Sequence, residues 1–172
     1  GDVAEATTLI LRELGNEIFG YLVTLTRNHD DAREAYARFG EQLFKSMPRY
    51  AGECSARTWA YKIAWRTARD LRNEAYARRR SPLRTSVAER LVADERASTA
   101  AYRKTGARRW IERVREGLPP DDQSLLTLRI DRGLEWREIA EVMQADSAAL
   151  RKRFERLKKR LCELARSEGL LS

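Results

Sequence analysis

Apolar residues near the start of the chain recur at steps of three and four positions, which is the period of an amphipathic helix. The members of this first stripe are Leu11, Leu14, Ile18, Leu22 and Leu25. A polar segment at 28–31 interrupts the pattern, and we expect Asp30 to cap the helix that follows. That second helix should end before Pro48, because a proline cannot continue a helix. Its apolar face comprises Ala32, Ala35, Tyr36, Phe39, Leu43 and Met47.

A third helix is predicted after the loop at 49–54, with Ser55 as its cap. Trp59, Ile63 and Leu71 should face inward, and three helices of this length can bury one small core. Residues 81–105 begin with Ser-Pro and have weak periodicity, so we interpret them as a linker that could include a short helix at 88–97. The alternative is that they pack as a fourth helix of the first unit.

The helical pattern restarts in the second half of the chain, with apolar residues at Trp110, Ile111, Val114 and Leu118. The next helix can open at 119–120, since a proline fits the first helical turn. Its apolar residues lie within 125–130, and Gly133 is typical of the position just past a helix end. A short helix is expected at 135–143, with its inward face formed by Trp136, Ile139, Ala140 and Met143.

Three residues, 144–146, separate this short helix from the last one, which Asp146 should cap. The apolar stripe of the last helix comprises Leu150, Phe154, Leu157, Leu161 and Leu164. A short helix, a tight turn and a long basic helix are typical of the helix-turn-helix motif. We therefore predict an all-α fold of two small helical domains, at 1–80 and 106–172, joined by a linker at 81–105.

Charge is concentrated in two segments of the 172-residue chain, which carries 34 Lys and Arg against 26 Asp and Glu. Residues 1–50 have a net charge of −2, residues 51–104 of +7 and residues 105–172 of +3, and the stretch 147–166 alone has +6. Two basic segments, one in each half, indicate two separate contacts with a polyanion such as nucleic acid.

The last helix is the stronger candidate for binding DNA. A recognition helix inserts its N-terminal half into the major groove, where Arg or Lys reads guanine and Glu can accept from cytosine. The predicted base-reading residues are Arg151, Lys152, Glu155 and Arg156, and Lys159 also lies off the apolar stripe. Arg153 and Lys158 should contact phosphates instead. The alternative is a solvated basic face on a bundle helix.

The third helix is the second candidate, because its aromatic residues alternate with cations. Tyr61 and Trp65 are four positions apart and therefore share one face. The cations around them are Arg57, Lys62, Arg66 and Arg69. Aromatic rings beside cations suit single-stranded nucleic acid, whose bases stack on them. The alternative is that both rings merely cover the linker, because exposed aromatics often mark a domain interface.

The chain lacks the motifs of the common enzymes. It has no Gly-rich phosphate loop, no H-E-x-x-H and no G-x-S-x-G, so we expect neither catalysis nor a cofactor. Two cysteines and one histidine are too few for a usual zinc site, and we interpret Cys162 as a helix-core thiol. Without a C-x-x-C pair the composition is typical of a reduced, cytoplasmic protein. No apolar run approaches the roughly 20 residues of a membrane helix, so no membrane partner is expected.

The order of these parts resembles that of a sigma factor of the extracytoplasmic-function class, the minimal bacterial promoter-specificity subunits. In the first half the resemblance rests on Y-A-G-E at 50–53 and S-A-R-T-W-A-Y-K-I-A at 55–64, which is similar to the family's F-R-G-E-x-S-x-R-T-W-L-Y-x-I-A. In the second half it rests on four short segments, L-P-P at 118–120, G-L at 133–134, E-I-A-E at 138–141 and R-K-R at 151–153. It covers about residues 9–166.

The resemblance implies two partners, core RNA polymerase and promoter DNA, and many relatives also have an anti-sigma factor. The first domain would dock on the polymerase clamp and open the minus-ten element, and the second would read the duplex minus-thirty-five element through the last helix. The minus-ten residues implied in the loop and third helix are Tyr50, Arg57, Tyr61, Lys62, Trp65, Arg66 and Arg69.

The helix expected to bind the clamp departs from the family, which usually has D-A-E-D-L-x-Q-E-x-F where this chain has D-A-R-E-A-Y-A-R-F-G at 31–40. Arg38 replaces an acid, which should alter the electrostatic fit with polymerase. Gly40 replaces an aromatic residue and costs about 0.5–1 kcal/mol of helix stability relative to Ala. The candidate clamp-binding residues are Arg33, Glu34, Ala37, Arg38 and Glu41.

Two smaller departures are Arg66, where the family commonly has Asn, and Glu135, where a Ser or Thr would cap a helix. Two other functions therefore stay open. One is a helix-turn-helix DNA-binding regulator with an altered or lost polymerase contact. The other is a protein-binding helical adaptor.

Overall fold

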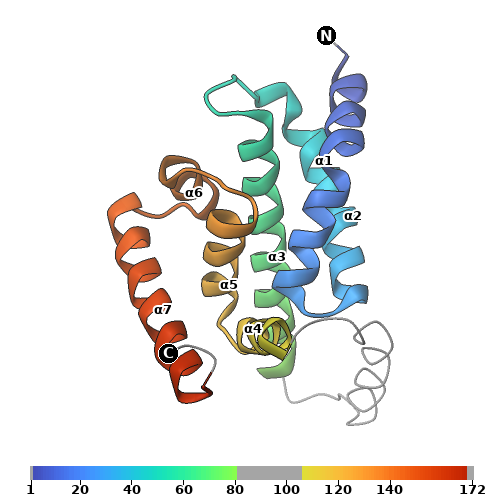
Figure 1. Ribbon diagram of the computed structural model, residues 1–172. Coiled ribbons are helices and arrows are strands. Elements are labelled where there is room, and N and C mark those ends of the chain that lie inside the picture. Colours follow the sequence, from blue (N-terminus) through green and yellow to red (C-terminus); the bar gives the residue numbers. More distant parts are fainter. Residues whose placement is uncertain (1, 81–105, 170–172) are drawn as a thin grey trace.

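The computed structural model describes residues 2–80 and 106–169, and the regular elements within these ranges are all helices (Figure 1). The α-helices are α1 Val3–Thr26, α2 His29–Ser46, α3 Ala56–Arg80, α4 Gly106–Glu116, α5 Pro120–Leu126, α6 Trp136–Met143 and α7 Ser147–Ser167. Two short helices join them, the 3-10 turn η1 Met47–Arg49 and the π-helical η3 Thr127–Asp131. The all-α prediction is confirmed, and the linker at 81–105 with its possible short helix lies outside the described residues.

The first half is a bundle of α1, α2 and α3, in which α2 runs opposite to its two neighbours (Figure 1). The chain reverses after α1 at Arg27, whose φ of 58° is left-handed. The cap of α2 is Asn28, whose side chain accepts from the backbone N–H of Asp30 at 2.8 Å. The expectation that Asp30 is the cap is wrong, because Asp30 already lies in the first turn and donates to the cap. Ser55 caps α3 as predicted, accepting from the N–H of Thr58 at 3.0 Å.

The predicted apolar faces of the first two helices form the core of this bundle. Ile18, Leu22 and Leu25 of α1 are buried, and so are Phe39 and Leu43 of α2. The spacing of three and four therefore placed these side chains correctly, since it keeps them on one side of each helix.

In the second half, α6 and α7 are joined by residues 144–146, and Gln144 adopts a left-handed φ of 52° that ends α6. Asp146 caps α7 as predicted, with its carboxylate 2.8 Å from the N–H of Ala149. Glu135 precedes α6, in the position that a Ser or Thr often occupies as a helix cap. Its backbone N–H donates to the Glu138 carboxylate at 2.8 Å, and this bond helps to fix the start of α6 although no Ser or Thr is present.

Two predictions for α7 are wrong near its C-terminal end. Leu164 is 39% exposed, and Ala165 is the buried residue there. Cys162 is exposed rather than part of the core. It lies one position past Leu161, about 100° around the helix, so it falls off the apolar stripe.

The two halves pack against each other. Helix α6 lies along α3, and α5 lies against α1 (Figure 1). The buried apolar residues of both halves form one continuous cluster, which runs from Ile18 in α1 to Leu157 in α7. Within it the hydroxyls of Tyr21 and Ser124 are 2.6 Å apart and fully buried. The domain boundaries remain a prediction, but the halves share one core here.

Candidate nucleic-acid interface

The N-terminal half of α7 has an exposed basic surface. Its apolar residues Leu150, Phe154 and Leu157 are buried, which turns the opposite side of the helix outward. The side chains that are exposed there are those of Arg151, Lys152, Glu155, Arg156 and Lys159. These are the residues predicted to read or border a DNA groove, and the structure brings them together on one helix.

Two contacts hold this end of α7 in place. The Trp136 ring of α6 meets the Phe154 ring edge to face at 5.3 Å, and the Arg151 guanidinium lies 5.9 Å from the Trp136 centroid. Arg153 differs from its neighbours, because its Nε donates to the Asp122 carboxylate of α5 at 2.6 Å. Arg153 would have to leave that ion pair to contact a phosphate.

The aromatic pair in α3 does not offer free ring faces in this structure. Tyr61 is fully buried and Trp65 is 6% exposed, so the expectation of an exposed stacking face is wrong. Tyr61 packs against Tyr21, with ring centroids 5.0 Å apart, and the Arg69 guanidinium covers Trp65 at 4.8 Å. Tyr61 lies where α3 meets α1, and Trp65 belongs to the buried cluster that the two halves share, which spacing along a single helix cannot show.

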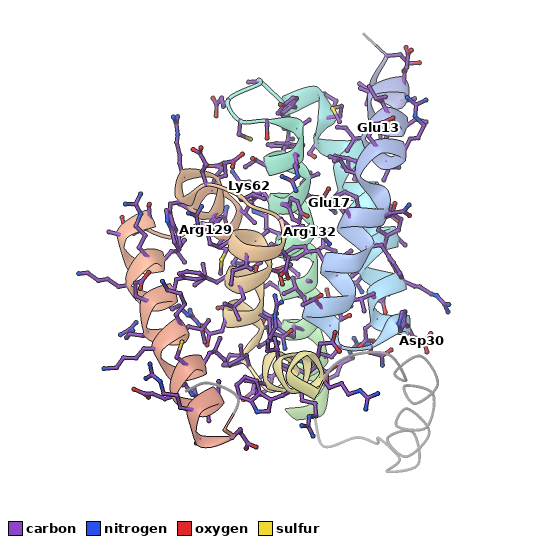
Figure 2. All side chains as sticks on the ribbon, viewed as in Figure 1. Glu13, Glu17, Asp30, Lys62, Arg129 and Arg132 are labelled. Carbon is purple, nitrogen blue, oxygen red and sulfur yellow. The ribbon has the colours of Figure 1, made fainter. Side chains whose placement is uncertain are left out.

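Glu17 of α1 is the centre of a polar cluster at this junction (Figure 2). Its Oε1 accepts from the Tyr61 hydroxyl and from the Arg57 Nη2, each at 2.6 Å. Arg132, which follows η3, donates from Nη2 to the Glu17 backbone carbonyl at 3.3 Å. Arg57 also donates to the Arg132 carbonyl at 3.1 Å, so the cluster joins α1, α3 and the second half.

The protonation of this cluster follows from its contacts. Burial raises the pKa of the Glu17 carboxyl, but the hydrogen bonds from Tyr61 and Arg57 outweigh it and leave the pKa below its usual value of 4.5. Burial and the bond to Glu17 both raise the pKa of the Tyr61 hydroxyl. Glu17 is therefore charged and Tyr61 neutral near pH 7, which is the arrangement in which Tyr61 donates.

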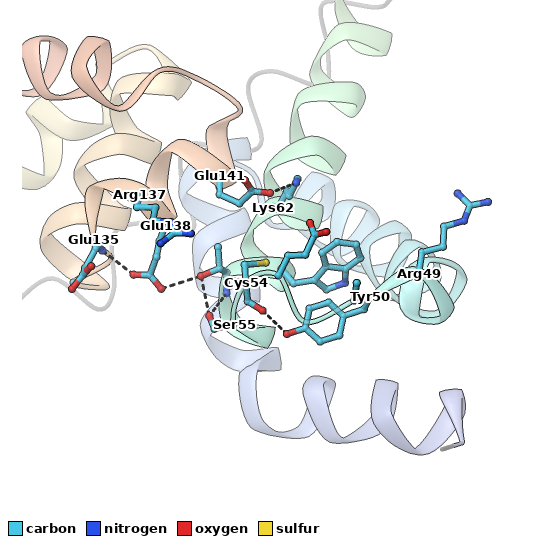
Figure 3. A pocket seen from close by; sticks show the side chains of 14 residues that line it. Arg49, Tyr50, Cys54, Ser55, Lys62, Glu135, Arg137, Glu138 and Glu141 are labelled. Atoms are coloured by element: carbon cyan, nitrogen blue, oxygen red, sulfur yellow. Dashed lines mark hydrogen bonds and ion pairs between the residues drawn. The ribbon is translucent and has the colours of Figure 1, made fainter.

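A cleft of about 810 Å³ lies between the 50–55 loop, α3 and α6 (Figure 3). On the loop side the Tyr50 ring packs against Trp59 in a tilted arrangement, with centroids 5.3 Å apart, and its hydroxyl donates to the Cys54 carbonyl at 2.5 Å. Across the cleft, the Thr58 hydroxyl donates to the Glu138 carboxylate of α6 at 3.0 Å, and Lys62 forms an ion pair with Glu141. Of the predicted minus-ten residues, Arg66 is exposed and Tyr50 is partly buried. The side chains of Arg57 and Arg69 are each 40% exposed, and that of Lys62 is 18% exposed.

The candidate clamp-binding residues lie along α2, and two of them, Arg38 and Glu41, line a pocket together with Lys62 and Arg66 of α3. Arg33, Glu34, Ala37 and Glu41 are exposed. Arg38 donates from Nη1 to Glu74 of α3 at 2.8 Å and from Nη2 to Glu34 at 2.7 Å. The positive charge of Arg38 is thus compensated by two carboxylates of the same chain.

Sequence reasoning missed the residues that join the halves, above all Glu17, Arg132, Glu138 and Glu141. Glu17 did leave a signal, because it falls between Leu14 and Tyr21 on the apolar side of α1, where a carboxylate needs buried partners. Glu138 and Glu141 gave no such signal, since acids on a short surface helix are ordinary.

No protein-family model matches the sequence. Over 158 residues the chain is 24% identical to the RNA polymerase sigma-H factor of Pseudomonas aeruginosa, an alignment that covers 87% of this chain and 80% of that protein. This similarity supports a sigma factor relation for the chain and spans both halves. Among the described residues, no helix is long and apolar enough to cross a membrane.

Proposed function

We propose that this protein is a bacterial sigma factor of the extracytoplasmic-function class, which binds core RNA polymerase and directs it to two-element promoters in the cytoplasm. The observation that carries the proposal is the similarity to a sigma factor over 158 residues, because it includes both the first bundle and the helix-turn-helix half. A protein that shared only the second half would be an ordinary helix-turn-helix regulator.

For the minus-thirty-five element, the proposal places the N-terminal half of α7 in the major groove of the duplex. The exposure of Arg151, Lys152 and Arg156 supports this role, and so does the ordered cap at Asp146. Guanidinium and ammonium groups in such a position can donate to guanine, and Glu155 can accept from cytosine.

For the minus-ten element, the proposal uses the 50–55 loop and α3, with Arg57, Lys62, Arg66 and Arg69 as the cations near the strand. Helix α2 would meet the polymerase clamp through Arg33, Glu34, Ala37, Arg38 and Glu41. The pairing of Arg38 with Glu34 and Glu74 supports this part, because an arginine whose charge is compensated within the chain repels a basic partner surface less than an unpaired arginine would.

Reconstitution with bacterial core RNA polymerase tests the proposal. The full chain should co-elute with polymerase and, after selection of bound DNA fragments, give run-off transcripts from the selected promoters only. Arg151→Ala/Arg156→Ala should lose these transcripts, whereas Arg166→Ala, an exposed arginine at the far end of α7, should keep them. The absence of both polymerase association and promoter-dependent transcript contradicts the proposal, and duplex binding without polymerase association would favour the regulator.

A further inference from the structure

Trp136, the first residue of α6, has two guanidinium groups over its ring. The Arg129 Cζ lies 5.0 Å from the ring centroid, and the Arg151 Cζ lies 5.9 Å from it. At these distances a cation is attracted to the face of an aromatic ring, and tryptophan attracts cations more strongly than Tyr or Phe. Arg129 comes from η3 and Arg151 from α7, so one ring connects three elements of the second half.

The Trp136 ring is fixed by contacts other than the one with Arg151. It packs edge to face on the buried Phe154, with centroids 5.3 Å apart. Arg129 is itself fixed, because its Nη1 donates at 2.9 Å to the carbonyl of Leu134, a buried residue of the turn before α6. The ring is thus a firm support for the exposed Arg151 side chain.

The support distinguishes Arg151 from the other predicted base readers. Among the described residues, no carboxylate forms an ion pair with Arg151, so its donors are free while the ring limits where the guanidinium can lie. Lys152 and Arg156 are also exposed, but within 2–80 and 106–169 they have neither a ring nor a carboxylate partner. Glu155 is paired with Lys158 of the same helix at 2.9 Å.

A stacked arginine is well suited to reading a base. A guanidinium that lies on a ring keeps the N–H groups at its edge free, and these are the groups that donate to O6 and N7 of guanine. A long side chain that is already ordered loses less conformational freedom when it binds. A wrong base is also rejected more strongly, because the donors cannot shift to other acceptors.

We propose that Trp136 is a positioning residue for base reading. Its ring holds Arg151 where the guanidinium donates to one guanine of the minus-thirty-five duplex, and Arg129 holds the ring. The inference rests on the proposed function and adds to it the residue that sets the strength of discrimination at one base pair. Trp136 acts through Arg151 and does not itself contact the base.

Binding of the holoenzyme, assembled from the full chain and bacterial core RNA polymerase, to promoter duplexes tests this. The duplexes carry the promoter obtained by selection and its single-base-pair variants in the minus-thirty-five element. At each position the ratio of the affinities for the selected and the substituted base pair is measured. Arg151→Ala should lower this ratio at one position, which identifies the base pair that Arg151 reads.

Trp136→Leu should lower the ratio at that same position by about three- to tenfold, the range expected from the loss of a cation–π contact. At the position that Arg156 reads, the ratio should stay within about twofold of the wild type, because independent sites contribute additively. A ratio of two affinities measured on one preparation does not depend on the fraction of folded protein. A partly unfolded variant therefore does not imitate the expected result.

Two further variants separate positioning from a general effect on structure. Trp136→Tyr keeps a ring face for the guanidinium and should keep the ratio within about twofold of the wild type. Ile130→Ala, at an exposed residue next to Arg129, is the matched control and should change no ratio. In an Arg151→Ala background, Trp136→Leu should have no further effect at the Arg151 position, because the residue that it positions is absent.

The positioning role is overturned if Trp136→Leu weakens binding equally on every duplex or lowers the ratio further in the Arg151→Ala background. It is also overturned if Arg151→Ala changes the ratio at no position. Each of these results leaves polymerase binding and promoter recognition by the wild type intact. If the wild type forms no holoenzyme or prefers no duplex, the proposed function itself fails, and the inference fails with it.

Discussion

Glu17 is the residue on which the polar junction between the halves depends. Glu17→Ala would leave the fully buried Tyr61 hydroxyl without its acceptor and would take from Arg57 its carboxylate partner, so that Arg57 keeps only the Arg132 carbonyl. We expect a loss of about 1–3 kcal/mol in the free energy of unfolding, measured by urea titration. Glu13→Ala, four positions earlier and exposed, serves as control, and equal small losses for both variants would contradict the importance of the cluster.

The same carboxyl makes the stability of the protein depend on pH. Because the pKa of Glu17 is lower in the folded protein than its usual 4.5, the unfolded chain binds its proton first as the pH falls. The contribution of Glu17 is therefore complete above about pH 4.5 and is lost as the pH drops through the lower folded pKa. Urea midpoints measured between pH 6 and pH 3 should fall more steeply for the wild type than for Glu17→Gln, and parallel curves would argue against it.

Arg156 is the residue whose role in DNA reading is most direct to test. It is exposed on α7, six positions past Leu150, the first buried residue of that helix. If it reads a base edge, Arg156→Ala should cost about 1–3 kcal/mol at one position of the minus-thirty-five element and relax the base preference there. Binding to a set of single-base promoter variants measures this. Equal weakening on every sequence would identify a phosphate contact instead.

At the scale of the helices, glycine positions in α1 and α2 predict opposite effects. A Cβ at Gly40 of α2 would meet nothing within 4 Å, whereas a Cβ at Gly15 of α1 would come 2.5 Å from the Tyr36 hydroxyl. Gly40→Ala should therefore stabilise the protein by about 0.5–1 kcal/mol, and Gly15→Ala should destabilise it. Thermal unfolding of both variants measures this, and a shift in the same direction for both would contradict the close approach of α1 and α2.

The helices themselves were predictable from local patterns. Apolar spacing located the buried sides of α1, α2 and α6, and Ser55, Asp146 and the proline at 120 marked helix starts, because caps act over three or four residues. The exposure of the C-terminal turns of α7 could not be predicted in this way. Burial there depends on which helix lies opposite, and not on the apolar stripe of α7 alone.

At the scale of the molecule, the shared core predicts that the halves unfold together. In a Trp110→Phe/Trp136→Phe background, the remaining tryptophans, Trp59 and Trp65, report on the first half. Ile139→Ala in α6 should lower the stability seen by these tryptophans by about 2–5 kcal/mol, as for a fully buried apolar residue. A fluorescence transition that does not move, with loss of helix elsewhere, would show two independently folding domains.

The sequence by itself determined the helices, most of their caps and the basic side of α7, because these features depend on residues within one or two turns of each other. Only the tertiary structure decided that α3 is covered. The contacts of α3 with its neighbours join residues 40 and 79 positions apart, in the pairs Glu17–Arg57 and Lys62–Glu141, and α5 is held on α1 by the pair Tyr21–Ser124, 103 positions apart. A sequence with cations beside aromatic residues does not indicate whether a helix or a DNA strand will contact them. Either partner can offer anionic groups to the cations and apolar surface to the rings. The packing of α5 on α1 and of α6 on α3 is what decided which partner these α3 residues contact in this structure.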